Sequence, residues 1–192
     1  MGVVVTSRTR TKAPEKRRDE LMVAAQRLFL ERGVGATTIE QIALGAEVAK
    51  GTFYLYFSSK EDVLAALRDR FAQELLLGIK AAVADKAAED WMGKLAAWAE
   101  AGVAGYVASS ALHDMLFYAA RPATSEGLVD NILIDDLVEL LAGGVAAEAW
   151  YVEDARFVAV FLFNGLHGVV DGVKVGELGR MVQGIFLRAV GL

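Results

Sequence analysis

The segment KGTFYLYF, residues 50–57, lies between two helix-start signals, and this arrangement limits the fold more than any other feature. Its aromatic and β-branched side chains are typical of a strand. However, the threonine pair in TTIEQ, residues 37–41, and the pair Ser58 and Glu61 both fit capping boxes. The interval between these signals holds a short helix and two turns but no hairpin. We therefore predict a short helix within residues 50–57.

The segment before it has the periodicity of an amphipathic helix. Its apolar stripe comprises Leu21, Ala24, Ala25, Leu28 and Phe29. Gly33 follows and suits the left-handed position after a helix end. The next helix is capped either by Thr37 with Glu40 or by Thr38 with Gln41, and both alternatives fit the pattern.

Helical spacing continues through the rest of the chain. The expected interruptions are a break near Ser109–Ser110, an end at Arg121–Pro122, a new cap at Thr124 or Ser125, and a stop at Gly143–Gly144. The last two helices are expected over residues 157–173 and 178–190. Because we find no convincing strand and no repeat, the predicted class is all-α.

The composition argues against several kinds of chemistry. No cysteine is present, which excludes disulfides, thiolate metal sites and a cysteine nucleophile, and two histidines argue against a multi-histidine centre. We expect no metal and no cofactor. The longest stretch without a charged residue, 157–170, is too short to span a bilayer, and we find no secretory signal. A cytoplasmic protein is expected.

Charge is unevenly distributed along the 192 residues. Residues 1–60 contain ten Lys/Arg and six Asp/Glu, a net charge of +4, whereas residues 61–192 carry −9. A basic end on an acidic body suggests that this end binds a polyanion. A chance excess of surface lysines explains the charge equally well.

In order along the chain, the predicted helices and turn form a helix-turn-helix arrangement. The stretches AAQRLFLERGVGATTIEQIA and VAKGTFYLYFSSKEDVL resemble the N-terminal DNA-binding domain of the TetR family of bacterial transcriptional regulators. The resemblance covers about residues 16–65. It implies a flexible basic arm over residues 1–14, a helix-turn-helix DNA-binding domain over 15–62, and a helical ligand-binding and dimerisation domain over 63–192.

The recognition helix of such a domain presents its N-terminal side chains to the major groove. Helical spacing pairs Lys50 with Tyr54, Thr52 with Tyr56, and Phe53 with Phe57 on three different faces. The phenylalanines are expected to pack beneath the helix. Gly51 removes a side chain where the protein backbone approaches DNA.

The resemblance implies roles at the matching positions. Lys50 and Thr52 are expected to read base edges. Thr38, Lys60 and one of the tyrosines are expected to bind phosphates, and two arginines at the start of the first helix bind the DNA backbone or reach the minor groove. The full set expected to contact DNA is Arg17, Arg18, Thr37, Thr38, Lys50, Gly51, Thr52, Tyr54, Tyr56 and Lys60.

Two positions in the turn region depart from the family pattern. Glu47 stands where glycine is common, and we expect it to remain exposed to solvent. Ala49 stands where serine is common, so one hydroxyl contact to DNA is lost.

A glycine stripe near the C-terminus suggests close helix packing, since glycine in a helix costs roughly 1 kcal/mol against alanine. We interpret the stripe as part of a dimer interface shared with the last helix. The expected interface residues are Phe161, Gly165, Gly168, Gly172, Met181, Ile185 and Phe186. The alternatives are packing within the chain or a loosely packed helix.

Aromatic and polar residues of the same region are candidates for ligand contacts. Asn164, His167 and Asp171 follow a neighbouring stripe, where buried polar groups need partners. The expected ligand-binding set is Trp98, Tyr106, His113, Phe117, Tyr118, Asn164 and His167, which suits a small apolar or aromatic ligand. Plain core packing is the alternative for each of them.

Together these features predict a homodimeric repressor that binds a palindromic double-stranded DNA operator and is released by a small-molecule effector. One alternative is a DNA-binding regulator without a small-molecule ligand. Another is an all-α enzyme that uses His113 or His167. We expect no enzyme, because no pattern of a catalytic triad accompanies either histidine.

Overall fold

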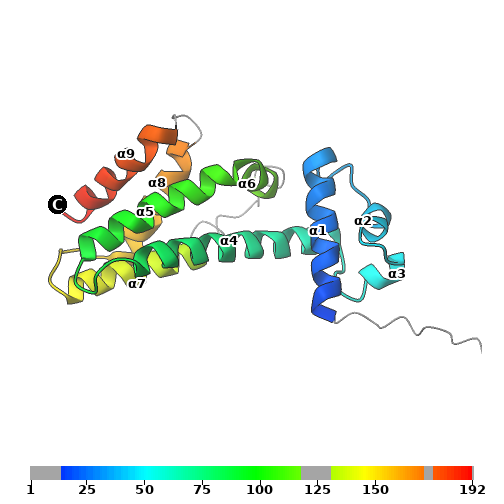
Figure 1. Cartoon of the computed structure of the whole chain (residues 1–192), viewed down its shortest axis with the longest axis horizontal. Helices are drawn as coiled ribbons and strands as arrows, with labels where there is room; N and C mark the ends of the chain where they lie inside the picture. The colour runs from blue at the N-terminus through cyan, green and yellow to red at the C-terminus, as the bar shows by residue number, and fades with distance from the viewer. Residues whose placement is uncertain (1–13, 118–130, 171–174, 192) are drawn as a thin grey trace, which may run out of the picture. The chain divides into compact units, whose positions relative to one another are not determined.

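Helices provide the regular structure of this chain (Figure 1). The computed structural model describes residues 14–117, 131–170 and 175–191, with side chains in all of these except 167–170 and 175–179. The helices are α1 (Pro14–Arg32), α2 (Ile39–Gly45), α3 (Lys50–Phe53), α4 (Lys60–Ala84), α5 (Trp91–Ala108), α6 (Ser110–Phe117), α7 (Ile132–Ala146), α8 (Ala155–Val170) and α9 (Val175–Ala189). No strand occurs in these ranges, and the predicted all-α class is confirmed.

Two compact units divide the chain, with the boundary inside α4 between Leu67 and Arg68. In unit 1, α1 packs against α2, and α2 packs against α3 (Figure 1). In unit 2, α5 packs against α9, and α7 packs against α8. The residues of α4 are therefore shared between the units, its first turns in unit 1 and the remainder in unit 2.

The predicted apolar stripe of α1 forms the centre of the core of unit 1. All five of its residues are buried. Gly33 has φ +80°, the left-handed conformation predicted after the helix end.

Thr38 is the N-cap of α2: its side chain accepts from the Gln41 N–H, and the Gln41 side chain accepts from the Thr38 N–H at 3.0 Å. The alternative cap, Thr37 with Glu40, is wrong.

The short helix predicted within residues 50–57 is confirmed as α3. The α3 helix ends at Phe53, and the next residues form turns in which the Leu55 N–H donates to the Thr52 carbonyl at 3.2 Å. Phe53 and Phe57 nevertheless pack beneath it as predicted, with 0% and 5% exposure and ring centroids 5.9 Å apart. These two rings anchor the short helix.

The cap of α4 lies one residue later than predicted. The Ser59 hydroxyl accepts from the Asp62 N–H at 3.1 Å, and the Asp62 carboxylate accepts from the N–H and the hydroxyl of Ser58. Hydrogen bonds from Ser58, and to a smaller extent from Ser59, lower the pKa of Asp62. The predicted pair of Ser58 with Glu61 is therefore wrong.

Unit 2 encloses a continuous apolar core lined by α4, α5, α7, α8 and α9. Its largest fully buried side chain is Trp98, whose ring stacks on Phe186 at 5.9 Å. The Trp98 indole N–H donates to the Asp136 carboxylate at 2.9 Å, and Lys80 pairs with the same carboxylate at 3.2 Å. The polar edge of this tryptophan is thus satisfied at the border of the core.

The structure tests one of the two predicted boundaries of α7, the stop at Gly143–Gly144, and this prediction is wrong. The N-cap of α7 is Asn131, whose side chain accepts from the Leu133 N–H at 2.9 Å, while the predicted cap at Thr124 or Ser125 lies outside the described residues. The helix continues through Gly143 and Gly144 to Ala146.

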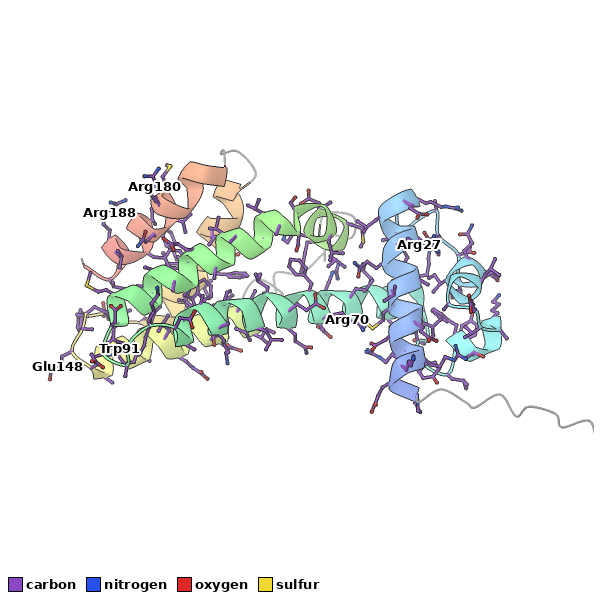
Figure 2. The ribbon with its side chains drawn as sticks, in the orientation of Figure 1. Arg27, Arg70, Trp91, Glu148, Arg180 and Arg188 are labelled. Atoms are coloured by element: carbon purple, nitrogen blue, oxygen red, sulfur yellow. The ribbon has the colours of Figure 1, made fainter. Side chains whose placement is uncertain are left out.

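Tryptophan rings explain why α7 contains two glycines. A Cβ atom would lie 2.7 Å from the Trp91 ring at Gly143 and 2.1 Å from the Trp150 ring at Gly144. The two tryptophan rings meet edge to face, with centroids 6.4 Å apart. Figure 2 shows Trp91 at the same end of unit 2 as Glu148, just beyond the end of α7.

None of the helices in the described part of the chain is long and apolar enough to cross a membrane.

Candidate nucleic-acid interface

A groove in unit 1 collects several of the residues predicted to contact DNA. Its volume is about 380 Å³, and it is lined by Gly35, Thr37, Thr38, Ile39, Glu40, Lys50, Tyr54, Ser58, Ser59, Lys60 and Glu61. The starts of α2, α3 and α4 all contribute to this lining. The fold therefore brings together three helix starts that are separated in the sequence.

Lys50, the first residue of α3, forms an ion pair with Glu40 of α2. The two side chains are 52% and 58% exposed. The hydrogen bond from Lys50 lowers the pKa of Glu40, and the same hydrogen bond raises the pKa of Lys50. Sequence analysis missed this role of Glu40, because nothing in the local pattern connects residues ten positions apart on different helices.

The remaining candidates on α3 and the following turn differ in exposure. Gly51 is exposed, and a Cβ atom there would have no neighbour within 4 Å. Tyr54 is 51% exposed and contacts Phe53 edge to face, whereas Thr52 and Tyr56 are half-buried. Side chains that can form hydrogen bonds therefore remain accessible above the buried phenylalanines.

Thr37 is not available to DNA in this structure, which corrects its place in the predicted set. The residue is 1% exposed. Its hydroxyl donates to the carbonyl oxygen of Gly33 at 2.9 Å and to that of Leu28 at 3.3 Å. Thr37 thus ties the end of α1 to the loop that leads into α2, while Thr38 remains exposed.

Lys60 also forms hydrogen bonds within the protein. Its ammonium group donates to the carbonyl oxygens of Thr37 at 2.7 Å and Val34 at 2.8 Å, with a longer contact to Gly35 at 3.4 Å. A lysine has three N–H donors, so one ammonium can donate to several of these carbonyls at once. This geometry gives the ammonium a role within the protein, and phosphate binding by Lys60 stays a prediction.

The two arginines near the start of α1 differ in their contacts. Arg17 pairs with Glu20 at 2.7 Å. Arg18 is exposed, donates to the sulfur of Met22 at 3.4 Å, and places its guanidinium 5.1 Å from the centre of the Phe57 ring. The guanidinium of Arg18 lies over the Phe57 ring. In this position its remaining N–H donors can face an anion.

Glu47 lies in the turn between α2 and α3 and has φ +56°. It is exposed, as predicted. The left-handed backbone explains why glycine is common at this position in the family that the sequence resembles.

The predicted ligand-binding residues do not form one group. Tyr106, His113 and Phe117 cluster with Phe71: the His113 ring lies 4.3 Å from that of Tyr106 and 4.8 Å from that of Phe117. Trp98 instead packs in the core. Asn164 donates to the Val160 carbonyl of its own helix at 2.8 Å, and the side chains of Tyr118 and His167 lie outside the described residues.

The predicted dimer interface is in large part an exposed apolar surface on α8 and α9. Phe161, Met181 and Ile185 are 65%, 51% and 41% exposed. A Cβ atom at Gly165 would meet no atom within 4 Å, so no helix in the described part of the chain packs on that glycine. Phe186 is 1% exposed and belongs to the core, which corrects its assignment. Gly172 lies outside the described residues, and Gly168 lies in the part of α8 whose side chains are not described.

Comparison with known proteins gives the same reading of unit 1. Residues 21–67 match the sequence model of the bacterial regulatory proteins of the tetR family. The HTH-type transcriptional repressor BepR of Brucella suis biovar 1 (strain 1330) is 39% identical over 72 residues, which are 36% of this chain and 34% of BepR. The chain thus spans about a third of that relative's length in the match.

Solved structures extend the likeness to the whole fold. The fatty acid degradation regulator FadR from Bacillus halodurans has a TM-score of 0.71 at 23% identity, over 95% of this chain and 98% of FadR. A bacterial regulatory protein in the tetR family from Rhodococcus RHA1 has a TM-score of 0.66 at 21% identity, over 92% and 97% of the two chains. At these identities the likeness is one of fold.

The fold and the groove therefore define a helix-turn-helix protein with a larger helical unit. Over residues 21–67 the chain is similar to the bacterial regulatory proteins of the tetR family. The resemblance found in its sequence is confirmed.

Proposed function

We propose that this chain is a transcription regulator whose α3 helix and surrounding surface bind double-stranded operator DNA. The observation that carries the proposal is the two-sided character of α3. Phe53 and Phe57 hold it in the core, while Lys50 and Tyr54 remain accessible. Gly51 has no neighbour that requires a glycine. If α3 enters the major groove, its backbone lies close to DNA. DNA is then the neighbour that requires a glycine at this position.

The charge distribution supports this proposal. The first 60 residues carry +4 on a chain of net charge −5, so the end that contains α3 attracts a polyanion. Thr37 is buried and is left out, so the proposed contact set is Arg17, Arg18, Thr38, Lys50, Gly51, Thr52, Tyr54, Tyr56 and Lys60.

We propose that the regulator is a homodimer joined through the exposed apolar surface of α8 and α9. Phe161, Met181 and Ile185 supply apolar area, and Gly165 lets a partner helix approach closely. A two-fold dimer presents two recognition helices to half-sites roughly 34–36 Å apart on a palindromic operator.

We propose that a small apolar or aromatic effector binds unit 2 near the cluster of Phe71, Tyr106, His113 and Phe117. Because the residues of α4 are shared between the two units, a shift of this helix transmits binding from unit 2 to unit 1. The effector must bind the DNA-free state more tightly than the DNA-bound state for release to follow. Repression is the proposed sign of regulation, as the name of BepR indicates for that relative.

We infer a binding function rather than catalysis, since His113 is 3% exposed and enclosed by aromatic rings. The expected place of action is the bacterial cytoplasm, where operator DNA lies.

Selection of bound DNA from a random pool tests the proposal. The expected result is an enriched palindrome with half-sites about 10 bp apart, bound with an affinity that falls steeply with salt. An unenriched pool, or binding that does not depend on salt, would contradict DNA binding.

A substitution at Gly51 then tests whether α3 makes the contact. Gly51→Leu adds a side chain into open space, so the protein should fold while its operator affinity falls at least tenfold. Gly78→Leu is the matched control, because Gly78 lies in unit 2 and its Cβ position is equally open. Equal operator affinity in both variants would remove α3 from the interface.

A further inference from the structure

The Glu40–Lys50 pair places a carboxylate within the surface proposed to bind DNA. Both side chains line the groove where α2, α3 and α4 begin, and both are more than half exposed. A negative charge there is unexpected, because it repels phosphates. Its contact with Lys50 suggests that it acts through that lysine.

The donors of Lys50 show what this contact does. A lysine ammonium carries three N–H donors. Glu40 occupies one, which leaves two for DNA. The major-groove edge of guanine offers two acceptors, O6 and N7, to a lysine or arginine. The two N–H donors that remain on the paired lysine therefore match the two acceptors of one guanine.

The carboxylate also changes which part of DNA attracts the lysine. A free ammonium is drawn to phosphates, which are the strongest negative charges of the duplex. Paired with Glu40, the lysine has little net charge to offer a phosphate. In water an exposed pair contributes little, but its attraction strengthens when DNA closes over the groove and excludes water.

We propose that Glu40 is a positioning residue that makes Lys50 a reader of guanine rather than a phosphate ligand. This inference rests on the proposed DNA-binding function. It assigns Glu40 to sequence discrimination, although the carboxylate itself lowers the overall affinity for DNA.

The test compares two variants that remove one negative charge from the same groove. Glu40→Gln removes the ion pair, whereas Glu61→Gln changes an exposed carboxylate in the first turn of α4. Operators selected by the wild-type protein are measured with each guanine of the half-site replaced by adenine, alongside random duplex DNA at several salt concentrations.

Glu40→Gln should bind random DNA several-fold more tightly and steepen the salt dependence by about 0.9 in log–log slope, one added phosphate contact. It should also lose on the order of tenfold in preference for one guanine. Glu61→Gln should keep the full guanine preference. An unchanged guanine preference in Glu40→Gln would overturn the inference, as would an equal loss in both variants.

Lys50→Met identifies the guanine concerned. If Glu40 acts through Lys50, both variants relax the same position of the half-site, and the double variant relaxes it no further. Relaxation at a different position would overturn the inference while leaving DNA binding intact. A wild-type protein that selects no DNA would instead refute the proposed function, so the two failures are distinguishable.

Discussion

The ammonium group of Lys60 donates to the carbonyl oxygen of Thr37 at 2.7 Å. Lys60 is the first residue of α4, and Thr37 precedes the cap of α2, so the bond joins two helix starts of unit 1. A second bond from the same ammonium, to Val34, closes the loop between α1 and α2. Carbonyl groups that are shielded from water need such partners.

Lys60→Met should therefore destabilise unit 1, because it leaves these carbonyls without their donor while keeping the apolar stem. The expected cost is about 1–3 kcal/mol. Hydrogen exchange of the amides of α1 and α2 measures the effect within unit 1. Lys86→Met, at an exposed lysine of unit 2, is the control and should change stability by less than about 0.5 kcal/mol. Equal protection in both variants would show that the lysine bonds contribute nothing.

Glu47→Gly should stabilise the protein, since Glu47 has φ +56° and a side chain in the left-handed region costs about 1 kcal/mol or more. Part of this gain is offset by the greater freedom of glycine in the unfolded chain. Chemical denaturation should show a net increase of about 0.5–1 kcal/mol.

Two further substitutions at left-handed positions serve as comparisons for that prediction. Glu148→Gly, at φ +58° beyond α7, should stabilise unit 2 for the same reason. Gly33→Ala, at φ +80° with no atom near its Cβ position, should destabilise unit 1 by about 1 kcal/mol through backbone strain alone. If Glu47→Gly lowered the stability, as Gly33→Ala is expected to do, the prediction that backbone strain at Glu47 destabilises the protein would be wrong.

Sequence reasoning succeeded where local pattern determines structure. The α1 stripe, the left-handed Gly33 and the buried pair Phe53 and Phe57 all follow from helical spacing and backbone preference. The threonine cap of α2 was narrowed to two choices, because TTIEQ fits two overlapping boxes. The fold chooses Thr38, since Thr37 is drawn into the core by the carbonyls of Leu28 and Gly33.

The errors came from partners distant in sequence. The bonds of Lys60 within the protein were missed, because the carbonyls that accept them lie more than twenty residues earlier. The glycines of α7 were interpreted as a helix stop, although the Trp91 and Trp150 rings require them within the helix. Phe186 was placed at a subunit interface, but it stacks on Trp98. Each of these positions is decided by tertiary packing, which local periodicity does not encode.

Gly144→Ala should destabilise unit 2 even though alanine favours helix. The new Cβ would lie 2.1 Å from the Trp150 ring, so the ring must move and its N–H bond to the Leu141 carbonyl, 3.0 Å long, is weakened. The expected cost is about 1–3 kcal/mol in chemical denaturation followed by tryptophan fluorescence. Gly78→Ala in α4, with open space at Cβ, should instead gain about 0.5–1 kcal/mol. A gain in both variants would mean that the ring does not constrain this position.

Phe161→Asp should dissociate the proposed homodimer. Phe161 is 65% exposed in the single chain and lies on the apolar surface of α8 and α9, so an aspartate there would be buried without a partner. Loss of a central aromatic contact costs about 2 kcal/mol or more, which is roughly a 30-fold or greater rise in the dimer dissociation constant. Sedimentation velocity measures the rise in the dimer dissociation constant. Operator affinity should fall with it, because half-sites are then bound singly.

Tyr151→Asp, at a 79% exposed aromatic residue outside that surface, is the control and should remain dimeric. If Phe161→Asp remained as dimeric as that control, α8 would lie outside the interface.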